Sequence, residues 1–227
     1  TTNVATQIDS PKVYYKIKPE IGYVVCGYCN ICFILKDDAD LDTDTVFFYD
    51  ERKSKLEELN TFLDKKEYSD LFKTIAETSI NYNYYANKEI YPFGYYGYGN
   101  LIHFKDLPEN FYDFRKDIDY NMEWLSEFYT YNKFLYSHFN NLALQKFYNT
   151  ATHKDVFDRK SVIYNLEKLN LIDSLISNEM IKNNLLKFTT RDFISSSDDS
   201  IETQQVLASY IQKSNNEKDK ILINSLA

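Results

Sequence analysis

The sequence predicts a mainly α-helical protein, with a small N-terminal β region followed by an irregular antiparallel array of helices arranged as a bundle or a short solenoid. Gly and Pro are scarce, with 5 and 4 residues in a chain of 227, which disfavours the turn-rich sandwiches and barrels. From Asp50 onward, apolar residues recur every three to four positions, the period of an α-helix. We therefore divide the chain into an extended lead-in with a small β region, residues 1–49, and a helical domain, residues 50–227.

The β prediction comes from short runs of β-branched and aromatic residues. Residues 1–12 are polar and predicted to be extended. The runs that follow are separated by polar breaks or by Pro19, and they cover residues 13–17, 21–25, 31–35 and 45–49. A sheet of this size buries little apolar surface by itself, so we expect it to depend on the helices for support.

The helical prediction comes from apolar stripes and capping residues. Leu56, Leu59, Phe62 and Leu63 form the first stripe. The segment beginning Asp106-Leu107-Pro108-Glu109 has the cap, the proline and the acid of a helix start. Including these two, the eight predicted helices cover about residues 50–63, 67–87, 106–118, 130–147 with Thr130 as cap, 155–169, 174–188, 200–211 with Ser200 as cap, and 217–226. Because no repeat of fixed length is evident, we expect an irregular array.

Composition excludes several classes of protein. The chain is 44% apolar and 26% charged, so it can build a core. Its net charge of −8 disfavours a nucleic-acid partner. No run approaches 18 apolar residues, so no transmembrane helix is expected, although a membrane-anchored context stays open. The polar start fits either a cytoplasmic protein or an exported chain whose signal has been removed.

The cysteines form one cluster, Cys26, Cys29 and Cys32. The first two make a Cys-x-x-Cys pair, a candidate redox site, and all three are candidate metal ligands if His103, His138, His153 or a carboxylate supplies a fourth. The alternative is that they are buried small residues of a strand. On a strand, Cys26 and Cys32 share one face and Cys29 lies on the other, which works against one site formed by all three.

The other candidate site is an aromatic, Gly-rich loop between the predicted helices. Its candidate binding residues are Tyr91, Phe93, Tyr95, Tyr96 and Tyr98. They could form a recognition patch, or they could pack over the helical core. The abundance of Tyr and Phe is likewise explained either by recognition or by an AT-rich genome. We expect His138, on an apolar helical face, to be a core histidine satisfied by a polar neighbour.

The run Leu107-Pro108-Glu109-Asn110-Phe111-Tyr112-Asp113-Phe114-Arg115-Lys116-Asp117-Ile118-Asp119 resembles part of the N-terminal helical region of TlpA-like thiol–disulfide oxidoreductases of bacterial cell envelopes. The similarity extends over about residues 45–227. It implies a helical region that accompanies a thioredoxin-fold domain, located in the periplasm or cell envelope. That family's active site is Trp-Cys-x-x-Cys, but the single Trp here is Trp124, so the Cys26 and Cys29 pair does not correspond to it.

Together, these observations predict a non-catalytic interaction domain that binds a protein or peptide partner and needs no cofactor. The alternative is a standalone redox or metal-binding protein that uses Cys26, Cys29 and Cys32. A host-interaction or immunity-type binding protein is not separated from the first hypothesis by sequence. Whether the chain catalyses a reaction is left open, with a non-catalytic role favoured, and cytoplasmic localisation remains the alternative to the envelope.

Overall fold

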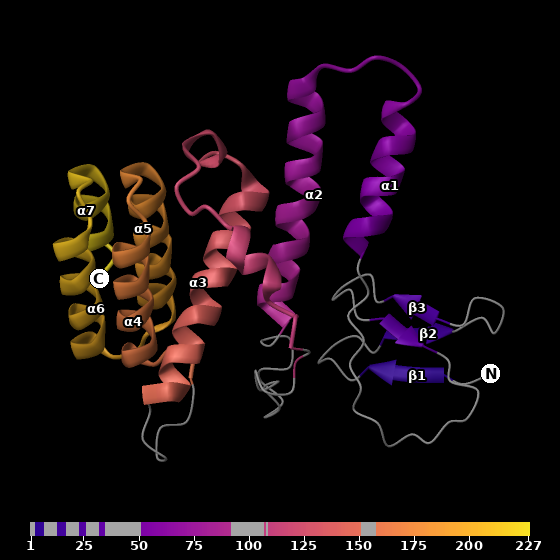
Figure 1. The fold of residues 1–227 in the computed structure, drawn as a ribbon. Coiled ribbons are helices and arrows are strands. Elements are labelled where there is room, and N and C mark those ends of the chain that lie inside the picture. Colours follow the sequence, from indigo (N-terminus) through magenta and orange to yellow (C-terminus); the bar gives the residue numbers. More distant parts are fainter. Residues whose placement is uncertain are drawn as a thin grey trace. The chain divides into compact units, whose positions relative to one another are not determined.

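The computed structural model describes residues 51–91, 107, 109–150 and 158–227, together with the backbone of four short strands nearer the N-terminus. The described part is mainly helical, which confirms the helical component of the predicted fold class (Figure 1). The α-helices are α1 (Glu51–Leu63), α2 (Asp70–Ile90), α3 (Tyr129–Thr150), α4 (Val162–Leu175), α5 (Glu179–Ser196), α6 (Ser200–Lys213) and α7 (Glu217–Asn224), and the 3₁₀ helices are η3 (Asp113–Asp117) and η4 (Glu123–Leu125).

The strands form two antiparallel pairs. β1 (Asn3–Thr6) pairs with β2 (Val13–Lys16) so that Val4 lies opposite Tyr15, and β3 (Tyr23–Val25) pairs with β4 (Cys32–Ile34) so that Val24 lies opposite Phe33. Only the backbone of these strands is described, so a packed N-terminal β region stays a prediction. The predicted run at residues 45–49 lies outside the described residues.

The chain divides into two compact units, residues 1–80 and 81–227, each of which is described by itself. In the first unit, aromatic rings pack where α1 is followed by α2. The Tyr68 ring centroid lies 4.9 Å from that of Phe62 and 5.1 Å from that of Phe72. The predicted domain boundary after residue 49 stays a prediction.

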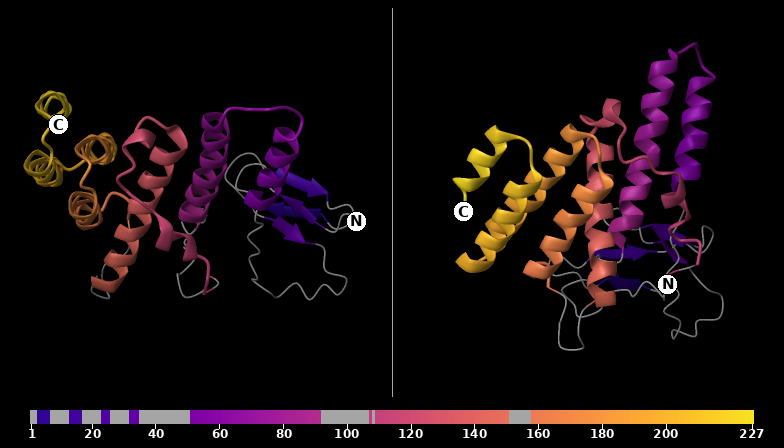
Figure 2. Two further views of the ribbon diagram at one scale, coloured as in Figure 1. Left: turned by 45° about the horizontal axis from the view of Figure 1, so that its top comes forward. Right: turned by 60° about the vertical axis from the view of Figure 1, so that its left-hand side comes forward.

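The second unit contains the stacked helices α3 to α7. Helix α4 packs against α3, α5 and α6, and α5 also packs against α6 and α7. The connections after α4, α5 and α6 are only a few residues long, so successive helices reverse direction, as Figures 1 and 2 show. This is the antiparallel array expected from the sequence. Its core is filled by Phe134, Leu135, Phe139, Leu169, Ile172, Ile181, Leu186, Val206, Leu207 and Tyr210.

Four short polar side chains begin these helices. Ser161, Asn178, Asp199 and Asn216 each accept a hydrogen bond from a backbone N–H in the first turn of α4, α5, α6 and α7. The caps of α4 and α6 lie 38 residues apart (161 to 199), as do those of α5 and α7 (178 to 216). The two hairpins therefore repeat in length, although their residues are too dissimilar for the sequence to reveal a repeat.

Some predicted helix boundaries are wrong. The segment from Asp106 does not form an α-helix where it is described: turns at 109–112 lead into η3, and Ile118 is extended. A short isolated helix is only marginally stable, and here the side-chain contacts of Arg115 and Tyr120 impose a tighter path.

The other differences are shifts along the chain. Thr130 lies inside the first turn of α3, and Asp199 rather than Ser200 caps α6. The helix expected from residue 155 is described as beginning after its cap Ser161, and the one expected over 174–188 is interrupted at 176–178, where Asn178 provides a new cap.

Candidate functional site

A polar stripe on α3 forms the first wall of a pocket. Lys133, Tyr136, Ser137 and Asn140 follow one another at i, i+3, i+4 and i+7, so they lie on one face of the helix. The neighbouring Phe134, Leu135 and Phe139 turn into the core. The stripe is therefore a continuous polar strip directly beside the apolar core.

The pocket lies between this stripe, the first half of α4 with the turn before it, and the last turns of α5. Its volume is about 550 Å³, within the range of small-ligand sites. It is lined by Ile90, Lys133, Tyr136, Ser137, Asn140, Arg159, Lys160, Tyr164, Asn165, Lys168, Asp192, Phe193 and Ser196. All of these residues belong to the second compact unit.

Among the described residues, the lining carries four basic residues and one acidic residue. The basic residues are Lys133, Arg159, Lys160 and Lys168, and the acidic residue is Asp192; Lys160 also lies 3.7 Å from the exposed carboxylate of Asp198 outside the lining. Asp192 also accepts a hydrogen bond from the Tyr136 hydroxyl, 2.7 Å from its Oδ2. The pocket is thus locally basic in a chain whose net charge is −8.

Lys168 is the buried cation of the pocket, with 4% of its surface exposed. Its Nζ lies 3.3 Å from Asn165 Oδ1 and 4.5 Å from the centroid of the Tyr164 ring. Burial lowers the pKa of the Lys168 ammonium to about 7, with Asp192 opposing the shift and Arg159 adding to it. Lys168 therefore changes its charge near neutral pH.

Asn165 sets the position of Lys168. It is buried, and its Nδ2 donates to the carbonyls of Arg159 at 2.8 Å and Ser161 at 2.9 Å. Those bonds hold the turn before α4 against the helix and direct the Asn165 oxygen toward the lysine. Lys133, at another side of the pocket, donates to Asn83 Oδ1 and Asn87 Oδ1 at 3.1 and 3.2 Å, and burial lowers its pKa as well.

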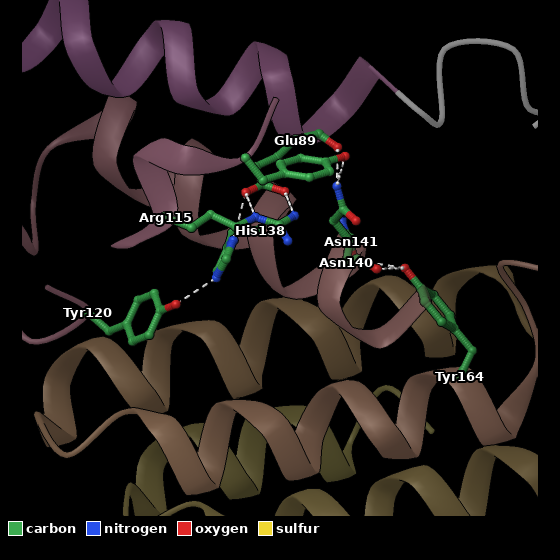
Figure 3. A network of polar contacts seen from close by, with 8 residues as sticks. Glu89, Arg115, Tyr120, His138, Asn140, Asn141 and Tyr164 are labelled. Atoms are coloured by element: carbon green, nitrogen blue, oxygen red, sulfur yellow. Dashed lines mark hydrogen bonds and ion pairs between the residues drawn. The ribbon is translucent and has the colours of Figure 1, made fainter. Parts of the chain in front are cut away.

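Beside the pocket lies a buried ionic network centred on Glu89, near the C-terminus of α2 (Figure 3). Arg115 donates from Nε and Nη2 to the two carboxylate oxygens of Glu89 at 2.7 and 2.5 Å. His138 Nδ1 lies 2.8 Å from Glu89 Oε1. Burial opposes the charged form of Glu89, but the hydrogen bonds from His138 and Arg115 outweigh it, so the pKa of Glu89 lies below its ordinary value.

The network continues on both sides of Glu89. The other ring nitrogen of His138, Nε2, lies 2.8 Å from the Tyr120 hydroxyl and is hydrogen-bonded to it. Asn141 donates to the Glu89 carbonyl at 3.2 Å and to the Tyr112 hydroxyl at 2.9 Å. Figure 3 also shows the adjacent pair of Asn140 and Tyr164, both of which line the pocket.

The order Tyr120, His138, Glu89 has the connectivity of a hydroxyl, a base and an orienting acid. Burial raises the pKa of Tyr120, with Arg115 opposing and Glu89 adding to the effect, so the phenol keeps its proton at neutral pH. Tyr120 and His138 also do not line the pocket. The network therefore fixes the end of α2, the segment around Arg115 and α3 in one arrangement, and thereby supports the pocket wall.

The structure separates the residues singled out from the sequence. The expectation for His138 is confirmed, because it is fully buried and bonded to Glu89 and Tyr120. Tyr91 is buried, and its ring centroid lies 5.8 Å from that of Phe111. At this one position, the observation agrees with the alternative that the aromatic residues pack over the helical core. The remaining candidates lie outside the residues described with side chains; they are Phe93, Tyr95, Tyr96, Tyr98, Cys26, Cys29, Cys32, His103 and His153.

Sequence reasoning missed both the pocket and the acid of the network. The polar spacing 133, 136, 137 and 140 was a usable signal for the pocket. Tyr82, Ala86 and Glu89 lie at helical spacing on the buried face of α2. An acidic residue in line with apolar residues of a predicted helix was therefore the sequence signal for the network. Within the described part of the chain, no group of three or more potential metal ligands is gathered, and no helix has the length and apolar character to cross a membrane.

Comparison of the chain with protein-family models, with curated proteins and with solved structures finds no match.

Proposed function

We propose that the helical region is a non-catalytic interaction domain that binds an acidic segment of a protein or peptide partner in the pocket between α3, α4 and α5. The observation that carries this proposal is the basic lining of a pocket of about 550 Å³ in an acidic chain. Stacked helical hairpins are common scaffolds for peptide recognition because their side chains are held on rigid elements. The four basic residues favour Glu and Asp side chains or a terminal carboxylate as the group that enters.

The resemblance to TlpA-like proteins supports a cell-envelope setting, in the periplasm or at the membrane surface, as part of this proposal. In that setting the helical region would present partners to a thioredoxin-fold domain. The alternative, a redox or metal-binding protein based on Cys26, Cys29 and Cys32, is tested separately. Replacing all three by Ser leaves peptide binding unchanged under our proposal, and elemental analysis of the purified protein tests for bound zinc.

Fluorescence anisotropy tests the binding function. The probes are a fluorescein-labelled peptide rich in Glu and Asp and a version with Gln and Asn in their place, compared at about 0.15 M salt, where exposed charges are screened beyond about 8 Å. We expect the acidic peptide alone to bind. Lys160→Glu places a negative charge at the pocket and is expected to weaken binding at least about tenfold, or about 1.4 kcal/mol.

Lys218→Glu is the matched control. Lys218 is an exposed lysine of α7 outside the pocket lining, so the variant makes the same charge change elsewhere. Its affinity should stay within about twofold of the wild type at this ionic strength. Equal weakening by the two variants, or equal binding of both peptides, contradicts the pocket as the binding site.

A further inference from the structure

We propose that Lys168 is the residue that recognises the ligand carboxylate, and that binding is coupled to uptake of a proton by its amine. This inference rests on the proposed function, because it names the group that the bound partner contacts and the chemistry of that contact. It goes further by predicting a specific dependence of affinity on pH.

The first argument is the incomplete set of partners around the amine. A charged lysine has three N–H donors, and the described acceptor for Lys168 is Asn165 Oδ1 at the long distance of 3.3 Å. Its other close neighbours are faces of rings, with Tyr164 at 4.5 Å and Tyr136 at 5.9 Å from ring centroid to Nζ. Within the described part of the chain, no carboxylate forms an ion pair with it. A buried ammonium in this state is costly, and a carboxylate in the pocket would satisfy it.

The second argument is the balance of charges that face Lys168. Asp192 of α5 lines the same pocket, but its Oδ2 accepts from Tyr136, and it forms no ion pair with the lysine. Lys133 and Tyr136 come from α3, and Arg159 and Lys160 from the turn before α4. No described residue of α6 lines the pocket. Burial disfavours the charged form of Lys168, Asp192 opposes that effect and Arg159 adds to it, and an anion entering the pocket would favour the charged form.

The third argument is the direction of the coupling. Burial lowers the pKa of the Lys168 ammonium to about 7. A carboxylate beside the amine raises that pKa toward the ordinary value, since an opposite charge favours the ionised form. At pH 8 the free protein is therefore mostly unprotonated at Lys168 and the complex mostly protonated, so binding takes up close to one proton.

Titration calorimetry of the wild-type protein tests the coupling directly. The acidic peptide is titrated at pH 8 in Tris and in HEPES, whose ionisation enthalpies differ, so the difference in observed heat gives the number of protons taken up. We expect a value near one and an affinity that falls as pH is raised from 7 to 9. Binding without proton uptake overturns this inference and leaves the proposed function standing, whereas the absence of binding overturns both.

Two substitutions and a second probe locate the effect. Lys168→Arg keeps a permanent charge, so it should bind at pH 8 without proton uptake. Lys168→Met should lose at least tenfold in affinity at pH 7 while showing the circular dichroism of a folded helical protein. Wild-type affinity in the Met variant overturns the assignment. Free glutarate that binds the wild type with the same proton uptake, but not Lys168→Met, supports Lys168 as the carboxylate site.

Discussion

Glu89 shows how one side chain can hold three segments of the chain together. Its carboxylate is fully buried, yet it stays ionised because Arg115 contacts both of its oxygens and His138 contacts one. An ionised group at this depth is tolerable only with such partners. The polar cluster thus fixes the relation between the end of α2, the residues around η3, and α3.

Replacing Glu89 by Gln is expected to destabilise the protein by about 3 kcal/mol at pH 7, because it leaves the partly buried Arg115 without its counter-ion. The depressed pKa means that Glu89 contributes its stability above its ordinary pKa and loses it as pH falls through the lower, folded-state pKa. The difference between wild type and Glu89→Gln should therefore shrink in acid. Urea unfolding at pH 7 and below pH 4 measures this.

Asp113→Asn is the control for that measurement. It removes an exposed pair with Lys116, whose Nζ lies 2.6 Å from Asp113 Oδ1. Exposed pairs of this kind contribute little to the free energy of unfolding. A Gln variant at position 89 that is no less stable than Asp113→Asn would show that the buried network does not hold the fold.

Lys168 has the opposite relation to stability. Because its pKa is lowered to about 7 in the folded state, the unfolded chain binds more protons between pH 7 and the ordinary pKa of 10.5. The wild-type protein should therefore gain stability as pH rises through that window. Lys168→Met removes this cost, so we expect it to be more stable than the wild type by about 2 kcal/mol at pH 6, with the difference falling toward pH 10.

Unfolding by urea at several pH values checks this prediction, with Lys218→Met as an exposed control that should show no such trend. A Met variant that is less stable than the wild type at pH 6 would mean that packing around the lysine stem outweighs the cost of burying its charge. If the Met variant is more stable, as expected, and also loses peptide binding, position 168 exchanges stability for recognition.

At the scale of elements, the stack of α4 to α7 depends on how each helix begins. Asp199 Oδ1 accepts from the N–H groups of Ile201 at 2.7 Å and Glu202 at 3.0 Å. Asp199→Ala should cost about 1 kcal/mol, since it leaves two first-turn donors without a protein partner and removes a negative charge at the positive end of α6.

The neighbouring Asp198 offers a matched control in the same loop. Its carboxylate is exposed and lies 3.7 Å from Lys160 Nζ. Asp198→Ala is expected to change the free energy of unfolding by less than about 0.5 kcal/mol. Equal effects of the two substitutions, measured by urea unfolding, would show that loop charge rather than capping stabilises α6.

The same elements show which parts of the fold the sequence could predict. Apolar periodicity predicted α1, α2 and α7 within a few residues, because their stripes and flanking breaks are local signals. It misplaced the start of α4 and missed the break before α5, since an Ile at 176 and Leu residues on both sides continue the apolar pattern through the turn. Two interactions end the helix there. The Asn178 side chain caps α5, and Asn121 Oδ1 accepts hydrogen bonds from the N–H groups of Ser177 and Asn178, both at 2.8 Å.

The site was harder to predict for a similar reason. Its pocket combines α3 with residues of α4 and α5 that are 20 to 60 positions further along the chain. Glu89 and His138 are 49 residues apart. When side chains from different helices meet only in the folded protein, the sequence shows just the pattern within each helix. The aromatic loop and the cysteine cluster are each contiguous in the sequence, so they were easier to notice.

At the scale of the whole molecule, ligand binding should stabilise the compact unit that contains the pocket. Trp124 is the only Trp of the chain and belongs to residues 81–227, where its ring lies 6.0 Å from that of Phe128. Its fluorescence therefore follows unfolding of that unit. A ligand that binds the folded state alone, present at about 100 times its dissociation constant, adds about 2.7 kcal/mol to the free energy of unfolding.

We therefore expect the acidic peptide to move the Trp124 unfolding transition to higher urea concentration in the wild type, and much less in Lys160→Glu at the same peptide concentration. The Gln and Asn peptide should leave the transition in place. The pocket lies in the unit whose unfolding Trp124 reports. The increase in the free energy of unfolding that the peptide causes must therefore match the increase calculated from the affinity measured by anisotropy. A transition that stays fixed while anisotropy reports tight binding would place the peptide on another part of the chain, because binding to the folded unit and its stabilisation are linked by mass action.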